Sequence, residues 1–110
     1  MLWVVIPHHS RREELNEAVK ASHPWPTIVV DDSRNGGLRL DQPNVSVVRS
    51  DGEQGFARAA NRGIMEAESR GASSILLLND DAVPRPGMIE SLLQAMEEHA
   101  EGDSVVGPVL

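Results

Sequence analysis

The sequence predicts an α/β fold, with three α/β/α layers built on a doubly wound, mostly parallel sheet of four or five strands. Short apolar runs alternate with segments whose apolar residues recur at helical spacing, which is typical of parallel sheets. Residues 75–78 are apolar at every position, as in a strand buried on both faces. A chain of 110 residues is long enough for one modest core, so we expect a single domain over residues 1–110.

Eight elements are expected, with strands at continuous apolar runs and helices where apolar residues recur every three or four positions. Strands are predicted at residues 2–6, 27–30, 45–48 and 75–78, with a fifth beginning at residue 105. Helices are predicted after Ser10, whose spacing to Glu13 fits a capping box, from Phe56 to a C-cap at Gly71, and from Pro86 to Gly102. Ala59 and Gly63 are small enough to let the second helix lie close to the sheet.

Composition excludes several classes of function. The 17 acidic and 10 basic residues give a net charge of −7, which argues against nucleic-acid binding because that needs a basic face. No cysteine is present, so neither a disulfide nor a thiolate metal site is available. No apolar run approaches the roughly 20 residues that span a bilayer. We therefore expect a cytoplasmic protein without a membrane span, in which an unpaired sheet edge and apolar helix faces favour a homo-oligomer.

Two acid pairs follow predicted strands. Asp31 and Asp32 come after residues 27–30, and Asp80 and Asp81 come after residues 75–78. Because parallel strands end at the same edge of a sheet, both pairs should meet where open α/β sheets bind ligands. Carboxylate oxygens there suit Mg²⁺ or Mn²⁺, which would also hold a phosphate. A solvated turn is the ordinary interpretation of one acid pair, but two pairs at one edge favour a binding site.

Four segments occur in a recognisable order and spacing over nearly the whole chain, at residues 4–7, 28–33, 55–63 and 78–87. Together they resemble the nucleotide-binding half of the family 2 glycosyltransferases, which have the GT-A fold. The rhamnosyltransferase-like branch is the most similar, since it often has an Asn-x-Asp metal motif, here Asn79-Asp80-Asp81, followed by a Pro-x-Pro-Gly turn. The resemblance implies a transferase that binds a nucleotide-diphosphate sugar through Mn²⁺ or Mg²⁺ and glycosylates an unknown acceptor.

The resemblance also implies roles for individual residues. Asp32 would accept a hydrogen bond from the uracil or thymine of a UDP- or dTDP-sugar. Asp81 would hold the metal that neutralises charge on the departing diphosphate, with Asp80 near the ribose or the metal. The other nucleotide-binding residues implied are Pro7, His9, Gly55 and Arg58.

For three residues an ordinary structural role stands beside the functional one. Asp31 is interpreted as a loop cap, Gly55 as the start of a helix and Arg58 as an exposed helix residue.

No catalytic residue is assigned. An inverting transferase needs a base for the acceptor hydroxyl, and Glu97, Glu98 and Glu101 lie at a helix end expected to face solvent. The acceptor half of family members follows the point where this sequence ends, so we expect the chain alone to transfer sugar slowly or not at all. A non-catalytic nucleotide-sugar-binding or interaction module is the alternative. A phospho-acceptor receiver domain fits poorly, because it needs a lysine after its fifth strand and the only lysine is Lys20.

Overall fold

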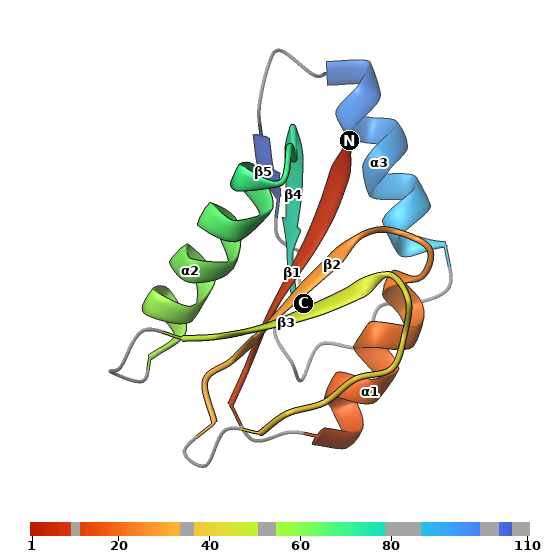
Figure 1. Ribbon diagram of the computed structural model, residues 1–110. Helices are drawn as coiled ribbons and strands as arrows, with labels where there is room; N and C mark the ends of the chain where they lie inside the picture. Colours follow the sequence, from red (N-terminus) through yellow and green to blue (C-terminus); the bar gives the residue numbers. More distant parts are fainter. Residues whose placement is uncertain (10–11, 34–36, 51–54, 79–86, 100–103, 107–110) are drawn as a thin grey trace.

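The computed structural model describes residues 1–9, 12–33, 37–50, 55–78, 87–99 and 104–106. One sheet has the strand order β3-β2-β1-β4-β5, and every pairing in it is parallel. Helices lie on both faces, which confirms the predicted three-layer α/β/α fold (Figure 1). The strands are β1 (Leu2–His8), β2 (Thr27–Asp31), β3 (Val45–Arg49), β4 (Ser74–Leu77) and β5 (Ser104–Val106). The helices are α1 (Arg12–Ser22), α2 (Phe56–Ser69) and α3 (Met88–His99).

Strand β1 lies at the centre of the sheet and defines where the strand order reverses. It pairs with β2 from Val4↔Thr27 to His8↔Asp31, and with β4 from Leu2↔Ser74 to Val5↔Leu77. The chain adds β2 and β3 on one side of β1 and then returns to add β4 on the other side. In open α/β sheets, ligands bind outside the carboxyl ends of the strands at such a reversal. The topology therefore predicts a ligand-binding site at the carboxyl ends of β1, β2 and β4.

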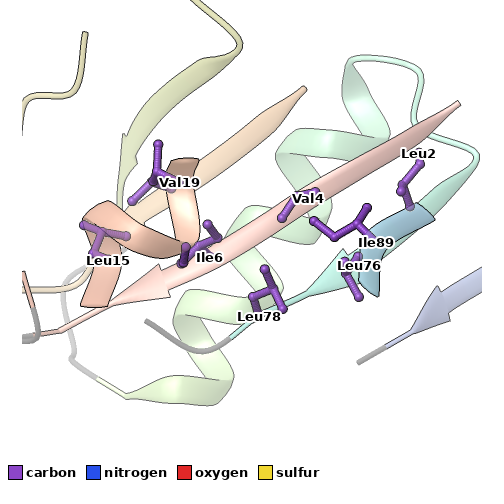
Figure 2. Packing of buried hydrophobic residues seen from close by; sticks show 10 residues of the cluster. Leu2, Val4, Ile6, Leu15, Val19, Leu76, Leu78 and Ile89 are labelled. Atoms are coloured by element: carbon purple, nitrogen blue, oxygen red, sulfur yellow. The ribbon is translucent and has the colours of Figure 1, made fainter. Parts of the chain in front are cut away.

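Two apolar clusters cover the faces of the sheet. On the face covered by α1 and α3, residues Leu2, Val4 and Ile6 of β1 pack with both helices (Figure 2). On the opposite face, Val5 of β1 packs with the α2 side of the core. Successive side chains of a strand point to opposite faces, so a strand covered on both sides is apolar at consecutive positions. The continuous apolar runs in the sequence follow from this two-sided burial.

Helix α2 lies unusually close to the sheet. Ala59, Gly63 and Ala67 form its buried stripe. A Cβ atom placed on Gly63 would lie 2.4 Å from Cγ1 of Val5 and 2.8 Å from Cγ2 of Val30, so no larger residue fits without movement. The predicted close approach through small residues is confirmed.

The connection through α3 departs from the right-handed crossover that is usual between parallel strands. Met88 and Ile89 of α3 belong to the same cluster as Leu15 of α1, so both helices cover the same face. From β1 to β2 and from β4 to β5, however, the chain moves in opposite directions along the sheet. The two crossovers therefore have opposite hands. Helix α2 already contacts β1, β2 and β4 on the other face, which leaves the α1 face as the open place for α3.

Element boundaries differ by a few residues from those predicted. The expected capping residue Ser10 lies outside the described part of the chain, and α1 begins at Arg12. Among the described residues, no helix has the length and apolar character needed to cross a membrane.

Candidate functional site

The carboxylate of Asp31, at the end of β2, is bound by nearby protein groups. Its Oδ1 accepts hydrogen bonds from the Ser33 backbone N–H at 3.0 Å and from the Ser33 hydroxyl at 2.5 Å. Its Oδ2 accepts one from the Leu38 N–H at 3.2 Å, and Nη1 of Arg49 lies 3.4 Å from Oδ1. Asp31 is only 2% exposed. These contacts confirm the interpretation of Asp31 as a loop cap.

The environment of Asp31 also stabilises its charged form. Burial raises the pKa of the carboxyl, but the hydrogen bonds from Ser33 and Leu38 and the charge of Arg49 outweigh burial. The resulting pKa lies below its ordinary value, so Asp31 carries a full negative charge at neutral pH.

Asp32 connects three elements at the same edge of the sheet. Its Oδ1 accepts a hydrogen bond from the Ser50 hydroxyl at 2.6 Å, just beyond β3, and its Oδ2 accepts one from the Gly55 N–H at 2.9 Å, just before α2. Its own N–H donates to the His8 carbonyl at 2.8 Å. Asp32 thus links the end of β2 to the segments that follow β3 and precede α2.

His9 and Pro7, both predicted to contact the nucleoside, occupy different environments. His9 is exposed, and its Nδ1 lies 3.3 Å from the Asp32 carbonyl oxygen, which places the ring beside Asp32. Pro7 lies inside β1 and is buried, whereas the sequence predicted that it ends the strand.

The position of Pro7 within a central strand has a geometric reason. The Val5 carbonyl accepts from the N–H of Leu78, so odd-numbered residues of β1 direct their backbone groups toward β4. Strand β4 ends at Leu77, opposite Val5. The missing N–H of Pro7 therefore falls beyond the last pairing with β4, where no ladder bond is lost.

Arg49 is a cationic residue of this edge that the sequence interpretation missed. Its Nη1 donates to the carbonyl oxygens of Asp31 at 3.0 Å and Ser33 at 2.7 Å. Arg49 and Ser50 directly follow the strand predicted at residues 45–48, so their position after a third strand was the available signal. Arg58 is exposed and lies in the first turn of α2, the helix that begins at this edge of the sheet.

The predicted metal ligand Asp81 and its neighbour Asp80 lie outside the described residues. The chain enters that segment from the carboxyl end of β4, where the Leu78 N–H is bonded to Val5 of β1. Within the described ranges, no group of three histidine, aspartate or glutamate residues is arranged to hold a metal ion.

The order of the elements, the sheet reversal and the acidic edge can now be compared with known proteins. Residues 3–109 match the family model for Glycosyl transferase family 2. The chain belongs to this family. No curated protein and no solved structure matches it. For this glycosyl transferase, the resemblance inferred from sequence is confirmed at the level of the family.

In this family 2 glycosyl transferase, four of the predicted nucleotide-binding residues lie around one sheet edge. His9 and Gly55 both contact Asp32, through its carbonyl oxygen and its carboxylate respectively. Arg58 follows Gly55 by one helical turn. Pro7 lies within β1 and is buried. Their roles toward a nucleotide remain predictions.

Proposed function

We propose that the chain is a donor-binding glycosyltransferase domain that holds a nucleotide-diphosphate sugar at the carboxyl ends of β1, β2 and β4. The observation that carries this proposal is the carboxylate of Asp32. It is 4% exposed, is held by Ser50 and Gly55, and lies at the edge where the strand order reverses. Membership of the family implies a nucleotide-sugar donor.

The proposed base contact explains why a carboxylate is needed at position 32. The imide N–H of uracil or thymine is a donor, and a held carboxylate is a strong acceptor for it. Cytosine has a lone pair at the same ring position, which the charge of Asp32 would repel. We therefore propose that UDP- or dTDP-sugars are the donors. The resemblance to the rhamnosyltransferase-like branch supports a dTDP-linked sugar as one candidate.

The diphosphate would be bound next to the base site. Arg58 lies in the first turn of α2, and the amino terminus of this helix faces the edge. Helix amino termini favour anions. Asp31 and Asp32 are occupied by protein donors, so they are poor candidates for metal ligands. Asp81, with Asp80 beside it, is the proposed ligand for Mn²⁺ or Mg²⁺. The ion would supply Lewis-acid stabilisation of the leaving diphosphate.

Titration calorimetry with UDP, dTDP, CDP and GDP, each with Mn²⁺ and with EDTA, tests the proposal. UDP and dTDP should bind at least about tenfold more tightly than CDP, because cytosine presents a lone pair instead of an N–H to the charge of Asp32. Metal should strengthen binding of both preferred nucleotides. Equal affinity for all four nucleotides, or no effect of EDTA, would contradict the assignment.

Two variants separate the base contact from the metal contact. Asp32→Asn keeps an acceptor for the Gly55 N–H and can donate to the Ser50 hydroxyl, so the backbone link survives. It should weaken UDP binding about tenfold with metal and with EDTA alike, because the hydrogen bond loses its charge. Asp81→Ala should remove the metal-dependent part alone. If both variants lost only metal dependence, the role proposed for Asp32 would be wrong.

A non-catalytic nucleotide-sugar-binding or interaction module is the second candidate. It is favoured because both Asp31 and Asp32 accept hydrogen bonds from protein groups. Neither of these two described residues is therefore a good catalytic base for an acceptor hydroxyl. Release of nucleoside diphosphate from a donor sugar, measured with and without acceptor mixtures, distinguishes the two. The expected homo-oligomer and the cytoplasmic location stay predictions, and sedimentation during these assays reports the first.

A further inference from the structure

Phe56 is an exposed aromatic residue in an unexpected position. Among the described residues, the exposed large hydrophobic side chains are Met1, Met65 and Phe56, and Phe56 is the aromatic one, at 53% exposure. Single exposed apolar residues are common on protein surfaces and by themselves indicate nothing. The position of Phe56 on its helix distinguishes it from such residues.

Phe56 belongs to the sheet-facing stripe of α2. It precedes Ala60 by four residues and Gly63 by seven, spacings that return to the same helix face. Ala60 is 6% exposed and Gly63 is packed against Val5 and Val30, so this face covers the sheet. Helical side chains also lean toward the amino terminus, which carries the ring of Phe56 further from the covered part of the stripe. Phe56 stands at the first position of α2 and is nevertheless exposed.

Phe56 begins α2 at the same edge of the sheet as Asp32. Gly55, the residue immediately before Phe56, donates its N–H to Oδ2 of Asp32 at 2.9 Å. His9, also exposed, contacts the carbonyl oxygen of Asp32 at 3.3 Å. The carboxylate of Asp32 is thus bonded to the residue that directly precedes an exposed aromatic side chain. Flat ligands with a donor on their edge are bound by this combination.

We propose that Phe56 is the stacking residue for the nucleobase of the donor and orients the base so that its edge meets Asp32. This inference rests on the proposed function, because it presupposes a nucleotide at this edge. Stacking of a base on an aromatic ring tolerates different bases, so Phe56 would add affinity while Asp32 would select the base. Its removal should weaken nucleotide binding about 5- to 100-fold.

Three variants test the proposal by calorimetric titration with UDP and, separately, with pyrophosphate, which has no base, both in the presence of Mn²⁺. Phe56→Ala should weaken UDP binding by the amount given and leave pyrophosphate binding unchanged. Phe56→Tyr keeps the aromatic face and should stay within about threefold of wild type. Met65→Ala is the matched control, since Met65 is exposed on the same helix but away from the stripe, and should bind both ligands as wild type does.

The outcomes separate this inference from the function on which it rests. A wild-type protein that binds no nucleotide refutes both. Wild-type binding of UDP with equal affinity in Phe56→Ala refutes the stacking role alone, and so does an equal loss of UDP and pyrophosphate. Because Phe56 is half exposed, Phe56→Ala should unfold at the wild-type temperature. If it does not fold, Phe56→Leu retains apolar bulk without a ring and should show the same selective loss.

Discussion

Replacing Gly63 with alanine should destabilise the protein, although alanine is the better helix former. The new methyl group would lie 2.4 Å from Val5 and 2.8 Å from Val30. Both valines are fully buried and β-branched, so neither can rotate away at low cost. Overpacking costs about 1–3 kcal/mol, and the gain in helix propensity offsets about 1 kcal/mol. Both contacts are below 3.0 Å, so the cost should lie in the upper half of that range. We therefore expect the free energy of unfolding to fall by about 1–2 kcal/mol, or the melting temperature by about 5–10 °C.

Urea denaturation of the wild type and four variants isolates the steric cause: Gly63→Ala, Asn61→Ala, Val5→Ala and the double variant of Val5 and Gly63. Asn61→Ala, at an exposed position of the same helix, should be neutral or slightly stabilising. In a Val5→Ala background only the 2.8 Å contact with Val30 remains, so the cost of Gly63→Ala should be clearly smaller. The reasoning is refuted if Gly63→Ala is as stable as wild type, or if its cost is unchanged when Val5 is truncated.

The other predictions concern the two aspartates. Asp31→Ala should lower the free energy of unfolding by about 2 kcal/mol, measured in urea, because Ser33 and Leu38 lose a charged acceptor. Because folding lowers the pKa of Asp31, its contribution is complete above about pH 4 and is lost as the pH falls through the folded pKa. The difference in free energy of unfolding between wild type and Asp31→Asn should therefore narrow below about pH 4. A difference that does not change with pH would contradict this. Asp32→Ala should cost about 2 kcal/mol in urea, against about 1 kcal/mol for Ser50→Ala; equal costs would argue against the Gly55 link.

The strands and the edge that carries the site could be predicted because a strand buried on both faces is apolar at consecutive positions of the sequence. Residues 75–78 and 28–30 are apolar throughout, as a doubly covered strand requires. Once the strands are parallel, every residue that follows one reaches the same edge. The meeting of Asp32 with the start of α2 at Gly55 follows from topology and needs no knowledge of side-chain contacts.

Contacts made by loops could not be predicted in this way. Asp31 and Asp32 are adjacent and chemically identical, and they differ because Ser33 and Leu38 bind one while Ser50 and Gly55 bind the other. These partners depend on the path of the backbone after the strands, which leaves no periodic pattern.

Two further differences have causes in the assembled sheet. Strand β1 continues through Pro7 because its partner β4 has already ended there. The hand of the α3 connection depends on which face of the sheet α2 leaves open. Neither cause can be seen in a segment of sequence considered alone.

The central place of β1 has a consequence for a chain that is synthesised from its amino terminus. Strand β1 emerges from the ribosome before the other strands of the sheet, but one of its two neighbours, β4, begins only at Ser74. Until then, the backbone groups of Leu2–Val5 that will pair with β4 have no partner in the sheet. Such an unpaired edge is open to pairing with another chain, and contacts between distant residues slow folding. The strand that organises the finished site is therefore the one most exposed to misassembly while the protein is being made.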